Sequence, residues 1–81
     1  MRHAHAAALD SIEPVLIALR QLNDLHEKKR GVFYKKSIAF IHFREDPAGI
    51  FADLRRGSEW LRLPVNTAAD RRRLLRLAKE S

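Results

Sequence analysis

The chain has 81 residues, no cysteine, and 16 Lys and Arg against 10 Asp and Glu, which gives a net charge of +6. This length allows one domain with a thin core, which neither disulfides nor thiolate-bound metals can reinforce. No apolar run is long enough for a signal peptide or a membrane span, so we expect a soluble cytoplasmic protein whose positive charge favours polyanionic partners or simply maintains solubility.

The N-terminal end of the chain predicts no regular structure. It is rich in alanine and has two histidines but no periodic apolar pattern. We therefore expect residues 1–10 to form a flexible lead-in, either frayed or loosely helical, and residues 11–81 to form a single small domain.

The domain is expected to begin with an amphipathic helix. Asp10 or Ser11 can cap it, and Glu13 and Pro14 both suit its first turn, where the amide groups are free. Apolar residues then recur at helical spacing. They predict a helix over residues 11–26 and are Ile12, Val15, Leu16, Leu19, Leu22 and Leu25.

The next segment predicts a linker and an extended stretch. HEKKRG, which ends at Gly31, has the cations and the glycine that are typical of a solvated helix end. Val32–Tyr34 is expected to be extended. Lys35–Ser37 forms either a turn between two strands or a polar part of one long strand. Because two lysines are poor turn chemistry, we expect a sheet of three or four strands.

Three strands separated by two turns are predicted in the centre of the chain. They are Ile38–Phe43, Ile50–Arg55 and Glu59–Val65. The first turn is the DPAG sequence at Asp46–Gly49, where proline presets one backbone angle and glycine accepts a left-handed conformation. The second is Gly57-Ser58, which fits a two-residue type II′ turn with glycine first.

The Gly57-Ser58 turn sorts the side chains of the second hairpin onto two faces. With these residues as the loop, Arg56 pairs with Glu59, and a slip of one residue would mix apolar with polar side chains. One face receives only the aliphatic residues Ile50, Ala52, Leu54, Leu61, Leu63 and Val65. The other face receives Phe51, Asp53, Arg55, Trp60 and Arg62.

We predict that this second face is a binding surface or a dimer interface. Asp53 is expected opposite Arg62, and Arg55 opposite Trp60. Such pairs each contribute about 0.2–1 kcal/mol to a sheet, and Trp and Arg are enriched at interface hot spots. The alternative is that this face is covered, either by the N-terminal lead-in or by the extended segment after Gly31.

The register of the first hairpin is open to two interpretations. A loop of three or four residues pairs Arg44 with Ala52 or Ile50 and places His42 on the aliphatic face. A shift of one residue instead pairs His42 with Asp53. Turn chemistry favours the longer loops, so we expect the face of Phe51 and Asp53 to be shared by Ala39, Ile41 and Phe43.

A second helix is predicted at the C-terminal end. Asn66 or Thr67 caps it, and Asp70 completes a capping-box variant. Its apolar side is formed by Leu74, Leu75, Leu77 and Ala78. Its basic side is an alternative site for nucleic-acid phosphates and is formed by Arg71, Arg72, Arg73, Arg76 and Lys79.

The expected architecture is α+β: an N-terminal helix, an antiparallel meander of three or four strands, and a C-terminal helix. The two helices cover the aliphatic sheet face, which gives a two-layer sandwich. The run AFIHFREDPAGIFADLRRG at Ala39–Gly57 resembles small uncharacterised bacterial proteins in which an aromatic-His-aromatic strand precedes a DPAG turn. That resemblance implies no known activity. The element order resembles a double-stranded RNA-binding domain, but NTAADRRR at Asn66–Arg73 lacks that family's lysine-rich helix start.

The residues predict a binding module and not an enzyme. A catalytic histidine needs an orienting partner and a nucleophile within reach. His42 has no such partners in the sequence pattern, and no glycine-rich phosphate loop is present. We therefore expect no catalytic residue, cofactor or metal site. The predicted partner is another protein or a second copy of the chain in a homodimer. The alternative is nucleic-acid binding by the basic side of the last helix.

Overall fold

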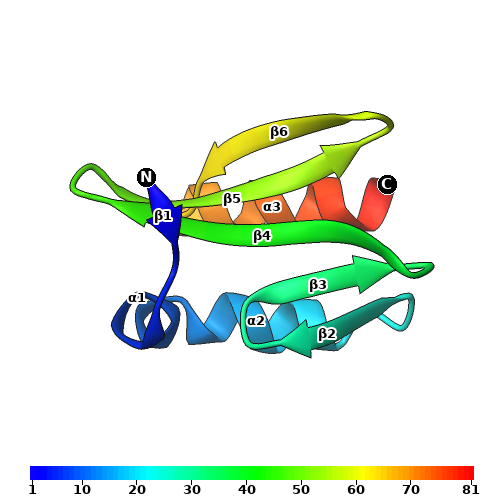
Figure 1. The fold of residues 1–81 in the computed structure, drawn as a ribbon, viewed down its shortest axis with the longest axis horizontal. Helices are drawn as coiled ribbons and strands as arrows, with labels where there is room; N and C mark the ends of the chain where they lie inside the picture. The colour runs from blue at the N-terminus through cyan, green and yellow to red at the C-terminus, as the bar shows by residue number, and fades with distance from the viewer.

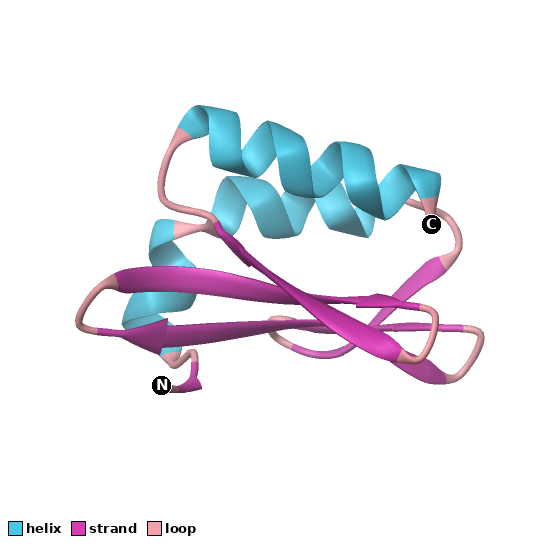
Figure 2. Ribbon diagram, turned by 90° about the horizontal axis from the view of Figure 1, so that it is seen from above, coloured by secondary structure: helices cyan, strands magenta, loops and turns pink.

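A computed structural model describes the whole chain, residues 1–81. It is an α+β fold with an antiparallel sheet and three helices (Figure 1). The helices are α1 (Ala6–Ser11), α2 (Glu13–Arg20) and α3 (Ala68–Glu80). Figure 2 shows α2 and α3 together in one layer above the sheet, while α1 stands beside the sheet edge. None of the helices is long and apolar enough to cross a membrane.

The sheet has the strand order β2-β3-β4-β5-β6, with antiparallel neighbours throughout. The short β1 pairs with the part of β4 that β3 leaves free. The expected α+β class and antiparallel sheet are confirmed, but there are more strands and one more helix than expected. The strands are β1 (Arg2–His3), β2 (Leu25–Lys29), β3 (Val32–Lys35), β4 (Ile38–Asp46), β5 (Gly49–Arg56) and β6 (Glu59–Pro64).

The core lies between the sheet and the helix layer. One stripe of α2, the residues Leu74 and Ala78 of α3, and the aliphatic face of the sheet meet there. Each Val, Leu, Ile or Phe side chain that is fully removed from water contributes about 1.5–3 kcal/mol to stability. The largest fully buried side chains are Phe33, Phe43, Ile12, Leu16, Leu19, Ile41, Leu54, Leu74 and Val65.

The first ten residues contain β1 and most of α1, so the helical alternative for this segment agrees with the structure over Ala6–Ser11, whereas β1 was not expected. β1 joins the sheet, and the amide of Ala4 donates a 2.9 Å hydrogen bond to the carbonyl of Phe43. The guanidinium group of Arg2 donates to the carboxylate of Glu45, and the Ala4 side chain is buried in the core. A strand of two residues is too short to show a period in the sequence, which is why β1 was not predicted.

The helix expected over residues 11–26 is interrupted near its start. α1 ends and α2 begins on either side of Ile12, whose backbone angles (φ −112°, ψ 17°) are not helical. Pro14 lies in the first turn of α2 and has no N–H group to continue the hydrogen bonds of α1. The proline therefore begins a new helix and does not sit inside a longer one.

The segment expected as a helix end and linker is the edge strand β2. α2 stops at Arg20, and its guanidinium group binds the carboxylate of Glu27 in β2. Leu25 fits both the helical spacing of α2 and the alternation of β2, so the apolar pattern did not distinguish the two. The extended segment Val32–Tyr34 is confirmed as part of β3.

A turn at Lys36-Ser37 separates β3 from β4. Both residues have positive φ angles, 53° and 67°, as a two-residue type I′ turn requires. The interpretation of Lys35–Ser37 as a turn between two strands is therefore correct, although neither residue is a glycine or an asparagine.

The predicted register of the second hairpin is confirmed. Asp53 pairs with Arg62, and Arg55 pairs with Trp60. Gly57 has a φ angle of +64° at the first turn position, which glycine adopts without the strain that a side chain would cause.

In the first hairpin the observed register is the alternative that we did not favour from the turn sequence. Its loop contains only the Pro and Ala of the DPAG sequence, so His42 pairs with Asp53. Gly49 lies in β5 with a φ angle of +136°, and a Cβ atom there would lie 2.8 Å from the side-chain nitrogen of Asn66. The glycine is thus needed for the close approach of Asn66, and not for a longer turn.

This register exchanges the two faces of β4. Ile41 and Phe43 are fully buried beneath the helices, and they do not share the face of Asp53 as we had expected. His42 and Arg44 lie on that face instead. The expectation was wrong because the glycine was assigned to the loop.

Candidate functional site

The sheet face turned away from α2 and α3 is the candidate site, and we call it the open face. Every strand contributes to it, because side chains alternate between the two faces of a sheet. One cross-strand row runs from Lys29 through Val32, His42 and Asp53 to Arg62. The charged and aromatic residues of the open face are His3, His26, Lys28, Lys29, Tyr34, His42, Arg44, Asp46, Phe51, Asp53, Arg55, Trp60 and Arg62.

Asp53 is a buried carboxylate at the middle of the open face. It is only 7% exposed, and two arginines bind it. Arg62 donates from Nε to Oδ1 at 2.7 Å and from Nη2 to Oδ2 at 3.0 Å, and Nε of Arg44 lies 3.3 Å from Oδ2. The hydrogen bonds from Arg62 lower the pKa of Asp53, although burial opposes them. The ionised carboxylate holds one guanidinium group from β4 and one from β6 in place.

Trp60 is the exposed aromatic residue of the open face. It is the only tryptophan of the chain, and 43% of the residue is exposed, which is a large fraction for a tryptophan. The guanidinium carbon of Arg55 lies 4.3 Å from the indole centroid, and the ring of His42 approaches edge-on at 5.5 Å. Arg55 is fixed in turn by a 2.6 Å hydrogen bond from its Nε to the carbonyl of Ala39. The indole is therefore oriented by its neighbours while part of it stays in water.

Two histidines lie beside this cluster. The ring centroids of His3 and His42 are 6.4 Å apart. Burial is the main cause that lowers the pKa of each, and nearby cations add to it, with Arg44 next in importance for His42 and Lys29 next for His3. Both imidazoles are therefore neutral at pH 7. Each can donate one hydrogen bond and accept another, so they add hydrogen-bonding capacity without adding charge.

A shallow hollow is formed where these groups meet. It has a volume of about 390 Å³ and is lined by His42, Arg44, Asp53, Trp60 and Arg62. The lining offers guanidinium donors, a neutral imidazole and an indole surface. Such a set can bind anionic groups and stack against a flat ligand.

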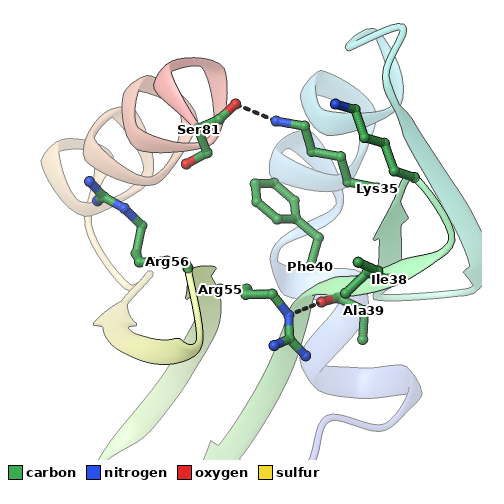
Figure 3. A pocket seen from close by; sticks show the side chains of 9 residues that line it. Lys35, Ile38, Ala39, Phe40, Arg55, Arg56 and Ser81 are labelled. Atoms are coloured by element: carbon green, nitrogen blue, oxygen red, sulfur yellow. Dashed lines mark hydrogen bonds between the residues drawn. The ribbon is translucent and has the colours of Figure 1, made fainter.

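A second hollow lies at one end of the sheet, where two hairpin turns approach the end of α3 (Figure 3). It has a volume of about 260 Å³ and includes the ring of Phe40. Lys35, which also lines it, donates a hydrogen bond to the carbonyl of Ser81, so its ammonium group is already bound. Arg55 lines this hollow too, and its bond to Ala39 crosses the base of the view in Figure 3. Arg55 thus connects this hollow with the open face.

The structure brings the five residues predicted for the sheet-face site onto one surface. They are Phe51, Asp53, Arg55, Trp60 and Arg62. The helices lie on the other side of the sheet, and Trp60 stays 43% exposed. His3 of the N-terminal segment lies beside His42 on this face. The chain therefore leaves the Trp60 part of this face uncovered.

Sequence reasoning missed the other half of the site. His42 and Arg44 were not assigned to it because the register of the first hairpin was wrong. The alternation of buried Ile41 and Phe43 with these two polar residues is a period-two signal that could have found them. His3 gave no such signal, because β1 is too short.

The basic side of α3, the alternative nucleic-acid site, lies in the helix layer on the opposite side of the molecule. Arg71 is used within the fold, since it donates to the carbonyl groups of Val65 and Ser11. Arg76 lies 4.0 Å from Glu80. The remaining cations of the set are exposed and are Arg72, Arg73 and Lys79.

Comparison with protein-family models, curated proteins and solved structures found no match to this chain. The fold and the open face therefore have to be interpreted from their own residues.

Proposed function

We propose that the protein is a non-enzymatic binding module and that the open face is its binding surface. The observation that carries this proposal is the exposed indole of Trp60 beside two guanidinium groups that Asp53 holds in place. Because 43% of Trp60 stays in water, a ligand that covers it removes further apolar surface from water. Side chains that are oriented before a ligand arrives lose less freedom on binding, and Trp and Arg dominate interface hot spots.

The chemistry of the open face supports binding more than catalysis. His42 is neutral and shares the hollow with Asp53. The oxygens of that carboxylate are bound by Arg62 and Arg44, and the rings nearest to His42 are those of Trp60 and His3. None of the six strands that form the open face contains a serine, threonine or cysteine. A nucleophile would therefore have to come from a ligand, which favours a binding role.

The partner in this proposal is a protein or another molecule that carries negative charge. Five lysines and arginines on the open face stand against only two carboxylates, Asp46 and Asp53. Two copies that met through this same face would repel each other, since an isologous contact brings like patches together. A homodimer, if one forms, is expected to use the exposed edge of β6 and to leave the open face free.

Photocrosslinking tests this proposal. Benzoylphenylalanine placed at Phe51 is a small change on the open face, and the same group at Ile17, which is 50% exposed on α2, is the matched control. We expect crosslinked adducts in a lysate of the source cell from position 51 only, and we expect Trp60→Ala to abolish them. Equal adducts from both positions, or none from position 51, would contradict the proposal.

A further inference from the structure

We propose that the ligand of the open face is a single-stranded nucleic acid, with a base stacked on Trp60 and phosphates bound by Arg44, Arg62 and Lys29. This inference rests on the proposed function of the open face as a binding surface. It differs from the alternative site on α3, because it places the nucleic acid on the sheet.

The charge of the open face suits a chain of phosphates. Both of its carboxylates are already bound: Asp53 by two arginines, and Asp46 by the amide of Ala48 at 2.8 Å. The cations are less restricted. Arg62 carries more donors than its two bonds to Asp53 use, and its side chain is 52% exposed. An approaching polyanion therefore meets free donors, while the charge of Asp53 is compensated by its two arginines.

The arrangement of these cations follows a line across the sheet. The cross-strand row begins with Lys29 on β2 and ends with Arg62 on β6, and His42 lies between them. Four strand spacings separate its ends, a distance of about 19 Å at roughly 4.8 Å per spacing. Arg44 lies beside the middle of this row. An extended strand of a few nucleotides can cross the sheet along it and meet a cation at both ends.

Aromatic groups next to the row favour unpaired bases over an acidic peptide. Trp60 is flanked by Arg55, and Tyr34 lies beneath the ammonium group of Lys28, which is 4.9 Å from its ring centroid. Stacking requires a base whose flat side is accessible, which a duplex hides and a single strand offers. A carboxylate-rich peptide would use the cations but has no need of an exposed indole.

The side of the molecule formed by α3 lacks this combination. Its exposed cations, Arg72, Arg73, Arg76 and Lys79, lie on a helix with no aromatic residue. They can attract phosphate but offer no surface on which a base can stack. This difference allows variants on α3 to serve as charge-matched controls.

The test is a titration of a labelled oligonucleotide of about 12 thymidines or uridines, followed by fluorescence polarisation with the full chain. We expect log K to fall with log salt at a slope of about −2, since each of the three phosphate contacts on a single strand contributes about −0.7. Trp60→Ala should weaken binding at least about fivefold, and Trp60→Phe should restore much of it. Lys29→Gln, an exposed change, should reduce the slope by about 0.7. Arg72→Gln with Arg73→Gln should leave the effect of Trp60→Ala unchanged.

Several outcomes would overturn this inference. One is no binding of either oligonucleotide at about 50 mM salt, where counterion release favours binding most. Another is binding that the α3 double variant abolishes and Trp60→Ala leaves intact. A third is a duplex of equal charge that displaces the single strand.

The two proposals can also fail separately. Adducts from position 51 that resist nuclease and contain a second protein would support the open face as a binding surface, but they would refute the proposal that its ligand is a nucleic acid. The absence of both adducts and oligonucleotide binding would refute both.

Discussion

Replacing Asp53 with alanine is expected to destabilise the protein by about 2 kcal/mol. The carboxylate accepts hydrogen bonds from Arg62 and Arg44, whose side chains are 52% and 37% exposed. Exposed ion pairs contribute about 0.2–1 kcal/mol, and loss of one partner from a fully buried pair costs about 3–5 kcal/mol. Because the carboxylate is buried but its partners are half exposed, the loss should fall between these limits.

Urea unfolding followed by circular dichroism at pH 7 measures this loss. A change of 2 kcal/mol corresponds to a fall in Tm of about 8–16 °C for a domain of this size. Asp53→Asn keeps the volume and one acceptor, so it should lose less, about 1 kcal/mol. The matched control is Glu59→Ala, an exposed carboxylate of the same hairpin, which should stay within about 0.5 kcal/mol of the parent. A free energy of unfolding for Asp53→Ala that equals the control would refute the role assigned to this carboxylate.

Three further changes test other parts of the structure. Thr67→Ala removes the side-chain acceptor of the capping box on α3 and should cost about 1 kcal/mol in urea unfolding; Thr67→Ser should restore most of it. Gly49→Ala forces a side chain against Asn66 at a φ angle of +136° and should cost about 1–3 kcal/mol, whereas a Tm unchanged by it would contradict the close approach. Folding lowers the pKa of His42, so its contribution to stability is complete above the unfolded value of about 6.5 and is lost as the pH falls through the folded value. His42→Gln should therefore flatten the decline of Tm between about pH 7 and 5, and a decline equal to that of the parent would count against the burial of this ring.

The second hairpin could be predicted because its information is local. Gly57-Ser58 fits one tight turn, and only one register separates the apolar residues of both strands from Asp53, Trp60 and Arg62. The start of α3 was predicted for a similar reason, since Thr67 and its capping partner lie within one helical turn of each other.

The elements that were missed depend on distant residues or on very short segments. Gly49 is required by Asn66, which is far along the chain, so the turn sequence alone suggested a longer loop. β2 is a strand because Glu27 meets Arg20 of α2 and because its backbone pairs with β3, and neither contact leaves an apolar period in the sequence. As a result, the sequence predicted that Asp53 belongs to the site but did not predict the same for its partner Arg44.

An NMR titration tests most directly the central claim that the open face binds a single-stranded nucleic acid. Trp60 is the only tryptophan, so its indole N–H gives a single resolved signal in a ¹⁵N-labelled sample of the full chain. On addition of oligothymidine we predict that this signal shifts together with the backbone amides of His42, Asp53 and Arg62, while those of α3 stay in place. Shifts confined to α3, or no shift of the Trp60 indole at saturating ligand, would contradict the account.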